Sequence, residues 1–451
     1  MLITGAIDSV RNMPAVALFG PQLVFFFVFA ALVFLIPVAL IAAELSSTFS
    51  ERSGIYAWTE YAFGAKVGFF AIWLQWANTV IWYPTILSFI AGTLAYLINP
   101  ALAQNKLFLI GVILSVLWMM TLINLRGIKT SAHFASFSAV IGLFIPVLLM
   151  ILLALIWIFY GNPSQLHFTS TNIFPTFSHS ESWISLTAIV TSFLGIELAC
   201  VHVNKVDNPK QTFPKALGLA TILILVTMIS GSLAIAIVIS SSKINLITGV
   251  METFKLFFST YHLSWLTSLL AIMIMIGSMG ELINWIISPA KGLQQAASEG
   301  FLPAFFAKKN RHDVASHILI IQAIVVSLLC LLFLFVPTVN EFYWLLTDLS
   351  TEIYVMMYVM MFISMLTIHF KYADNTKHYH IPGGVVGLFV TCAAGLFGCT
   401  VALIVGFFPP TDIGFNTLHY EIMFISGLII ILLPTLFFYW NYWKRNKISR
   451  A

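Results

Sequence analysis

The sequence predicts an all-α integral membrane protein with about twelve transmembrane helices, each near the roughly 20 apolar residues that cross the hydrocarbon of a bilayer. Of its 451 residues, 60% are hydrophobic and only 8% are charged, whereas soluble domains have roughly 45–50% and 25%. The charged residues are too few to cover a water-exposed surface of this size. The solvent around most of the chain is therefore expected to be lipid.

Eleven apolar runs are long enough to span a membrane. In chain order they are residues 21–43, 67–98, 107–125, 134–160, 183–203, 216–239, 263–287, 318–336, 342–368, 385–408 and 422–442. The first segment, residues 1–19, is a poorer twelfth candidate because Asp8, Arg11, Asn12 and Pro14 interrupt it. No cleavable signal peptide is expected, because the chain lacks a basic start followed by an unbroken apolar core.

The positions of Lys and Arg predict the orientation of the chain. With the loop after residue 43 in the cytoplasm, only Lys106, Lys243 and Lys255 fall in loops on the opposite side. Cytoplasmic loops carry the excess of Lys and Arg, so both termini are expected in the cytoplasm and the chain in the plasma (inner) membrane. The loops are short, so no soluble domain is expected, and the oligomeric state is left open.

Several function classes are excluded by composition and spacing. The four cysteines, Cys200, Cys330, Cys392 and Cys399, lie inside apolar runs without the spacing of metal ligands, so neither a metal site nor a disulfide framework is expected. The basic residues are dispersed, which argues against nucleic acid. No nucleophile with its base and no filter-like repeat is readable, so neither an enzyme nor a channel is expected, and no cofactor is predicted.

Charged residues inside the apolar runs are the candidate site residues. A charge in the middle of a membrane helix costs about 2.5–3.5 kcal/mol on insertion scales, so such residues are usually paired or functional. They are Asp8, Arg11, Glu197, Glu281, Asp348 and Glu352. Asp8 and Arg11 lie three residues apart. They are as consistent with a pair that only holds the helices together as with a role in a site. Glu197 and Glu281 are the candidates for proton coupling, because a desolvated carboxyl can exchange a proton where a surface carboxyl does not.

Two stretches are predicted to interrupt their helices, namely residues 5–14, which end in Pro14, and residues 192–197, which contain Gly195. Interruptions in the first and sixth spans are typical of an inverted repeat of five plus five helices, in which half-helix ends and bare backbone form a mid-membrane solute site. An amino acid suits such a site, because its carboxylate fits a half-helix N-terminus and its ammonium fits C-terminal carbonyls.

The sixth span also carries a resemblance. The string FLGIE at 193–197, followed by NPK at 208–210 and FPKA at 213–216, resembles the sixth-helix signature of the amino acid–polyamine–organocation (APC) superfamily. Within it the chain is most similar to the glutamate:GABA antiporter family. Nearly the whole chain supports this through IPV at 36–38, AEL at 43–45, WYP at 82–84, VHVN at 201–204, INL at 244–246, GVM at 249–251, Glu281 with Trp285, LPA at 302–304 and IPGG at 381–384.

The resemblance implies a LeuT-like transport core of helices 1–10 in residues 1–370, followed by two further helices and a short tail in residues 371–451. It also implies a secondary active antiporter that exchanges an amino acid, glutamate- or GABA-like, by alternating access. The implied substrate-binding residues are Ile7, Asp8, Arg11, Gly195, Ile196, Glu281, Trp285, Tyr354 and Tyr358. Tyr354 and Tyr358 lie on one helical face, where the alternative is simple packing.

Three departures from that family bear on the substrate and on gating. Helix 1 is expected to be short before its interruption, and the tail is expected to be too short for a folded C-terminal plug. Asp8, Arg11 and Glu352 are additional charges, and Arg11 could pair with a substrate carboxylate or with Asp8. A proton-coupled amino acid importer and a non-transporting amino acid sensor of the same fold remain alternatives.

Overall fold

The computed structural model describes residues 9–166, 173–174, 186–332, 334, 339–371, 379–408 and 417–448, and all of its regular elements in these ranges are helical. Within them, nine helices are long and apolar enough to cross a membrane. These are Gly20–Thr48, Ala65–Ile98, Lys106–Asn124, Thr130–Phe159, Pro209–Val238, Leu266–Ser298, Tyr343–Lys371, Gly384–Val405 and Leu418–Arg445, and Ser316–Leu332 is a shorter apolar helix. The predicted all-α membrane class is confirmed, while the total of about twelve helices stays a prediction.

Two spans in the first half of the chain contain a π-helical segment just before a proline. A 3₁₀ turn, Val10–Asn12, leads into α2 (Met13–Ala17), and Gly20–Gln22 leads into α3 (Leu23–Ala30) and α4 (Ile36–Thr48). The rest are α5 (Ile55–Phe63), α6 (Ala65–Ile98), α7 (Lys106–Asn124), α8 (Ile128–Ala139) and α9 (Ile145–Phe159). π-Helical segments, Ala31–Leu35 and Val140–Phe144, precede Pro37 and Pro146. Proline lacks an N–H, so the preceding turn can widen without losing a further bond.

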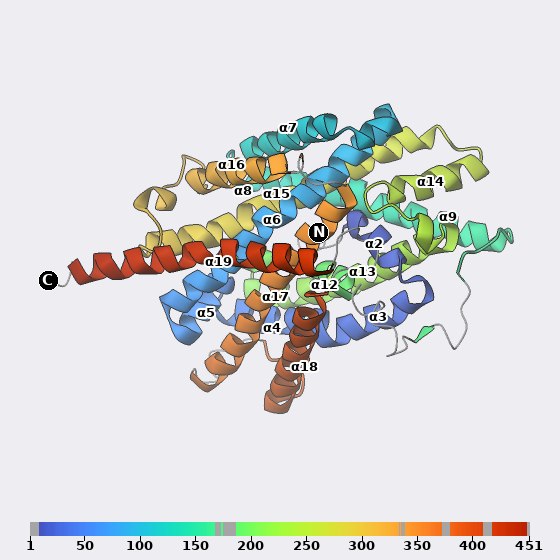
Figure 1. Ribbon diagram of the computed structural model, residues 1–451. Helices are drawn as coiled ribbons and strands as arrows, with labels where there is room; N and C mark the ends of the chain where they lie inside the picture. The colour runs from blue at the N-terminus through green and yellow to red at the C-terminus, as the bar shows by residue number, and fades with distance from the viewer. Residues whose placement is uncertain are drawn as a thin grey trace.

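The second half begins with a short helix and continues with long ones (Figure 1). The elements are α12 (Leu186–Thr191), a 3₁₀ segment (Leu198–Lys205), α13 (Pro209–Val238), α14 (Gly249–Thr260), α15 (Leu266–Ser298), a 3₁₀ turn (Ala304–Ala307), α16 (Ser316–Leu332), α17 (Val339–Lys371), α18 (Gly384–Val405) and α19 (Thr417–Ile448). Two 3₁₀ turns, Pro100–Gln104 and Ser241–Lys243, lie in loops.

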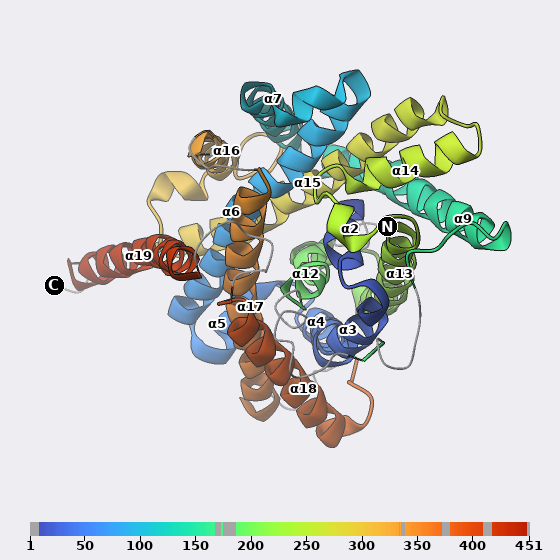
Figure 2. The same cartoon turned by 45° about the vertical axis from the view of Figure 1, so that its right-hand side comes forward.

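Helix α12 lies in the middle of the bundle. Figure 2 shows it between α2, α3, α4, α13 and α17, and it packs directly against α17, α3 and α2. Beside it, the long helix α6 packs against both α15 and α17. A short helix at this position ends in the interior, so its terminal backbone groups must find partners inside the protein.

Helix α19 runs along the outside of the bundle, against α6 and α17 (Figure 1). Its outward side chains are apolar and exposed, namely Leu418, Ile422, Ile425, Ile429, Ile430, Leu433, Leu436, Phe437, Trp440 and Trp443. Such an apolar surface is stable only against hydrocarbon or another apolar surface. The central helices therefore carry the polar interior, and α19 faces the lipid.

A close backbone contact sets the position of α15. A Cβ atom built on Gly142, in the π-helical segment after α8, would lie 2.2 Å from the backbone nitrogen of Gly277 on α15. Only glycine allows two backbones to approach this closely. The contact places the part of α15 that carries Glu281 beside the π-helical segment Val140–Phe144.

An ion cluster ties α5 to the end of α15, on the side that the distribution of Lys and Arg predicts to be cytoplasmic. The Arg52 guanidinium lies 2.9 Å from a carboxylate oxygen of Glu60 and also pairs with Glu299. The Tyr56 hydroxyl donates a hydrogen bond to Glu299. Burial raises the pKa of Glu60, Arg52 opposes the shift and the Glu299 charge adds to it, and together they move the pKa from 4.5 to about 7.

Because the pKa of Glu60 is raised in the folded state, its ionisation destabilises the protein as pH rises from 4.5 through about 7. We expect Glu60→Gln, which cannot ionise, to flatten this part of the stability curve, measured as the thermal unfolding midpoint in detergent against pH. The exposed Glu51→Gln serves as the matched control. Equal pH slopes for wild type and Glu60→Gln would contradict the assignment.

Candidate functional site

The sixth apolar segment is interrupted where the sequence predicted. Helix α12 ends at Thr191, residues 192–197 form turns, and a 3₁₀ segment begins at Leu198. Gly195 has φ +103°, a conformation that side chains rarely adopt, and a Cβ atom there would lie 2.7 Å from the Trp285 ring. The residue at 195 therefore has to be glycine, and the predicted helix break at 192–197 is confirmed.

Side chains of α6 and α17 hold the interruption in place. The Glu197 carboxylate, 1% exposed, accepts hydrogen bonds from the hydroxyls of Tyr354 and Tyr358 and from Gln75 Nε2 at 2.9 Å. The Tyr358 hydroxyl in turn accepts the backbone N–H of Gly195 at 2.9 Å. Three donors stabilise the carboxylate, and one freed backbone donor is satisfied without water.

The first segment is also irregular. Ser9 is extended (φ −128°, ψ 119°), Val10–Asn12 is a 3₁₀ turn, and α2 is only five residues long, with Pro14 near its start. The Ser9 hydroxyl donates to Glu281 Oε2 at 2.7 Å and so links this segment to α15. Ile7 and Asp8, two of the predicted site residues, lie outside the described residues.

A small cavity lies between the two irregular segments. Its lining residues come from the first segment, α6, the sixth segment and α15, and are Arg11, Asn12, Asn78, Trp82, Thr191, Leu194, Glu281 and Trp285. Its volume is about 10 Å³, which is barely enough for one water molecule. The rings of Trp82 and Trp285 stack at 4.9 Å between centroids, and Trp285 lies 5.7 Å from the ring of Tyr354. In this state the cavity is closed by aromatic side chains.

Arg11 gives the cavity a buried positive charge. The side chain is 1% exposed, and its Nη1 donates to Thr85 Oγ1 and to the Tyr343 hydroxyl, each at 3.0 Å. The guanidinium also lies 5.4 Å from the centroid of the Trp82 ring. Its Nε and Nη2 atoms have no hydrogen-bond partner among the described residues. A buried cation with unused donors is suited to bind an anionic group.

Glu281 gives the same cavity a carboxylate. It is 6% exposed and lies one turn before Trp285 on α15, so both side chains face the cavity. Asn78 on α6 adds a buried amide whose oxygen and nitrogen both lack partners among the described residues. The cavity therefore offers a cation, an anion and a neutral amide, which together match the groups of a zwitterion.

The structure brings together some of the predicted site residues and places others differently. Arg11, Glu281 and Trp285 line the cavity, and Gly195 and Ile196 lie in the interruption beside it. Tyr354 and Tyr358 are fully buried with their hydroxyls on Glu197 and are not among the residues that line the cavity. Their direct contact with a substrate stays a prediction.

Sequence reasoning missed five of the eight residues that line the cavity, namely Asn12, Asn78, Trp82, Thr191 and Leu194. Trp82 belongs to the WYP string of the family resemblance and is not among the predicted site residues, yet it lines the cavity beneath the Arg11 guanidinium. Asn78 was not singled out, although an amide in the middle of the apolar run 67–98 is costly unless it has a partner. That cost was the signal that could have identified it.

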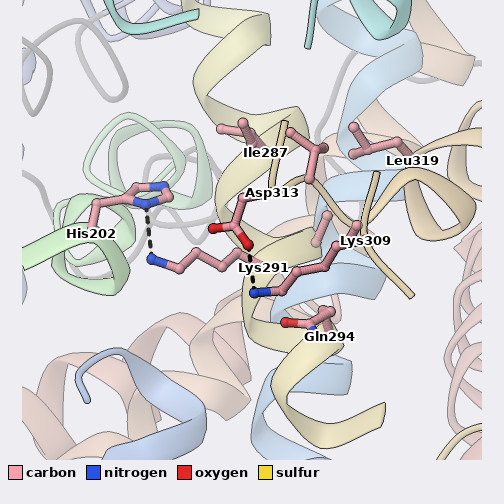
Figure 3. A pocket seen from close by; sticks show the side chains of 10 residues that line it. His202, Ile287, Lys291, Gln294, Lys309, Asp313 and Leu319 are labelled. Atoms are coloured by element: carbon pink, nitrogen blue, oxygen red, sulfur yellow. Dashed lines mark hydrogen bonds and ion pairs between the residues drawn. The ribbon is translucent and has the colours of Figure 1, made fainter. Parts of the chain in front are cut away.

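A second hollow, of about 40 Å³, lies between the 3₁₀ segment Leu198–Lys205 and α15 (Figure 3). Lys291 on α15 donates from Nζ to the Val201 carbonyl at 2.7 Å and lies 3.3 Å from His202 Nδ1. Lys309 and Asp313, in the loop before α16, form an ion pair at 2.8 Å beside the hollow. The Lys291 contacts join the 3₁₀ segment to α15.

Comparison with known proteins places these features in a family. The family model described as amino acid permease matches residues 1–434. The chain belongs to the amino acid permease family. The predicted APC resemblance is thereby confirmed, and the protein is a multi-pass membrane transporter and not an enzyme.

Relatives of this permease support the same conclusion. An uncharacterized transporter of Legionella pneumophila is 38% identical over 434 residues, 96% of this chain and 93% of that protein. A glutamate/gamma-aminobutyrate antiporter of Lactococcus lactis subsp. cremoris is 31% identical over 440 residues, 96% of this chain and 88% of its own. A probable agmatine/putrescine antiporter of Lactococcus lactis is 25% identical over 343 residues, 76% and 72% of the two chains.

We expect Tyr358→Phe to destabilise the permease by about 1–3 kcal/mol, because one buried donor and one buried acceptor lose their partner. The thermal unfolding midpoint in detergent measures the loss. Tyr439→Phe is the matched control, since its hydroxyl bonds the Lys66 carbonyl at a half-buried position, and a smaller loss is expected there. Equal losses in the two variants would show that Tyr358 does not hold the interruption.

Proposed function

We propose that this permease exchanges amino acids across the membrane by alternating access, with a glutamate-like amino acid as one substrate. The observation that carries the proposal is the cavity between the two irregular segments, in which Nε and Nη2 of Arg11 have no hydrogen-bond partner among the described residues. Its position between an irregular first segment and an interrupted sixth segment is typical of solute sites in transporters with discontinuous helices.

The lining of the cavity suits each group of an amino acid. A carboxylate can accept two parallel hydrogen bonds from Arg11 Nε and Nη2, which is the preferred geometry of that pair. The ammonium group can donate to the Glu281 carboxylate and to backbone carbonyls freed at residues 192–197. Asn78 can bond to either group through its amide. Trp82 and Trp285 would cover the aliphatic part of the substrate.

Alternating access follows from the size of the cavity. A volume of about 10 Å³ cannot hold an amino acid, so the substrate can enter only when the irregular segments separate from α6 and α15. We propose that α2, the span α3–α4, α12 with its 3₁₀ segment, and α13 move together against the rest. The ring stack of Trp82 on Trp285 would open and reform in each cycle.

The proposed substrate rests on two supports. The two Lactococcus relatives at 31% and 30% identity are named as glutamate/gamma-aminobutyrate antiporters. The unused donors of Arg11 fit a carboxylate on the substrate side chain or on its α-carbon.

We propose that the protein lies in the plasma (inner) membrane with both termini in the cytoplasm, because of the distribution of Lys and Arg. We also propose that helices 1–10, within residues 1–370, form a LeuT-like repeat.

Counterflow in proteoliposomes tests the proposal. Purified protein is reconstituted in liposomes loaded with unlabelled glutamate, and the uptake of labelled glutamate is followed against empty liposomes. An antiporter takes up label only when loaded. A proton-coupled importer accumulates label in empty liposomes under a pH gradient, and a sensor binds label without exchange. The other amino acids, GABA and common decarboxylation products are screened in the same way, at acidic and neutral pH.

We expect Arg11→Met to raise the KM for glutamate roughly tenfold or more, because a hydrogen bond to a charged group contributes about 1.5–3 kcal/mol and about 1.4 kcal/mol corresponds to a factor of ten. Exchange of glutamine, which has the shape of glutamate without the side-chain charge, would change less if Arg11 reads the side chain. The surface variant Arg311→Met is the control. An unchanged KM for both substrates would remove Arg11 from the site.

We expect Glu281→Gln to change the exchange rate or its pH dependence while membrane insertion and yield stay near wild type. The amide keeps the shape of the carboxylate and removes its charge, so the ammonium group of the substrate loses its counter-ion. Initial counterflow rates across a pH series measure the effect. Exchange kinetics equal to those of the wild type at every pH would exclude Glu281 from the site.

A further inference from the structure

A second pair of buried carboxyl groups lies outside the substrate cavity. Asp348 and Glu352 are four residues apart on α17, so their side chains lie one above the other. They are 2% and 1% exposed. Neither is among the residues that line the substrate cavity, and the function proposed above does not use them.

The pair has too few hydrogen-bond donors for two carboxylates. Asp348 Oδ2 accepts a hydrogen bond from the Tyr420 hydroxyl of α19 at 2.7 Å. Asp348 Oδ1 and Glu352 Oε2 have no partner among the described residues. No Lys, Arg or His in the described ranges forms an ion pair with either carboxyl. Two adjacent carboxyl groups without a counter-charge cannot both be ionised in a membrane interior.

The fold reserves space for the Glu352 carboxyl. A Cβ atom built on Gly406, which follows the end of α18, would lie 1.9 Å from Glu352 Oε1. The carboxyl group therefore sits against bare backbone, where any other residue would displace it. Three elements, namely α17, the end of α18 and α19, enclose the pair.

Glu197, beside the substrate cavity, differs from this pair. It accepts three hydrogen bonds, from Gln75, Tyr354 and Tyr358. Those donors stabilise a charged carboxylate. At Asp348 and Glu352 a bound proton would supply the missing O–H donor and cancel the charge at the same time, and a proton needs no cavity of its own.

We propose that Asp348 and Glu352 form a proton-binding site, separate from the substrate cavity, that takes up and releases a proton during the transport cycle. Among the described residues, the groups whose charge or hydrogen bond acts on the pair are the two carboxyls themselves and the Tyr420 hydroxyl. The described part of α18 brings no charged side chain to the site, because residues 384–405 contain none. Proton binding stands independently of the proposed substrate, whereas its role in the cycle rests on the proposed exchange.

The pair has a direct path to the interruption in the sixth segment. Thr351, beside Glu352 on α17, shares a hydrogen bond of 2.6 Å with Thr191, the last residue of α12. Further along α17, Tyr354 and Tyr358 hold Glu197. A change in the packing of α17 on α19 when the proton leaves would move the hydrogen bonds that hold the interruption.

Infrared difference spectroscopy of the purified full-length protein, with protons as the only added ligand, tests the binding step. We expect a protonated-carboxyl band at neutral pH that shifts in D₂O, is altered in Asp348→Asn and in Glu352→Gln, and is unchanged in the exposed control Glu51→Gln. Tyr420→Phe should shift the frequency of the band without removing it, because the phenol no longer donates to Asp348. This variant keeps both carboxyls and provides a readout if the others fail to fold.

Two spectroscopic results would overturn the proposal. The first is a wild-type spectrum whose carboxyl bands are the same in all three site variants. The second is loss of the band on adding Na⁺ at constant pH together with a rise in the thermal unfolding midpoint, because the pair would then be a cation site.

Proteoliposomes with an internal pH dye test the role in the cycle. We expect glutamate-driven proton movement in the wild type and its loss in Asp348→Asn or Glu352→Gln, while glutamate counterflow continues. Proton movement that persists in variants lacking the infrared band would overturn the role in transport. Failure of wild-type counterflow with the infrared result intact would instead refute the proposed exchange alone.

Discussion

The hydrogen bonds around Glu197 are the constraint on which the rest of the site depends. A membrane interior offers no water to backbone groups that leave a helix, so each must find a partner within the protein. Here the Gly195 N–H bonds the Tyr358 hydroxyl, and that hydroxyl and Tyr354 bond Glu197. The buried carboxylate thus fixes two side chains of α17, and one of them satisfies the backbone of the interruption. Without this network, residues 192–197 would satisfy their backbone hydrogen bonds better by continuing as helix.

The interruption places polar groups where a membrane protein otherwise has none. It lies beside the irregular first segment, and between them Arg11 and Glu281 line one small cavity closed by Trp82 and Trp285. A buried guanidinium whose Nε and Nη2 have no partner among the described residues destabilises a closed, empty state. Binding of an anionic group would offset that cost. The same feature therefore supports the proposal that this cavity is the substrate site.

The sequence predicted the features that depend on local pattern. Apolar runs identified the spans, and Gly195, in the stretch from Ser192 to Glu197, identified the interruption in the sixth. The sequence alone could not predict the contacts that depend on how helices distant in the chain pack together. Tyr354 and Tyr358 lie on one helical face whether they bind substrate or only pack. The position of Glu197 decides that their hydroxyls support the interruption. Asn78 and Trp82 were missed for the same reason, because their role depends on Arg11, which is distant in sequence.

A cryo-electron microscopy structure of the permease with bound glutamate tests the central claim most directly. The account predicts density for the amino acid between Arg11 and Glu281, with a carboxylate on Arg11 Nε and Nη2 and with residues 192–197 still outside any helix. It is contradicted if residues 192–197 run as continuous helix, or if glutamate binds elsewhere and Arg11 keeps only Thr85 and Tyr343 as partners.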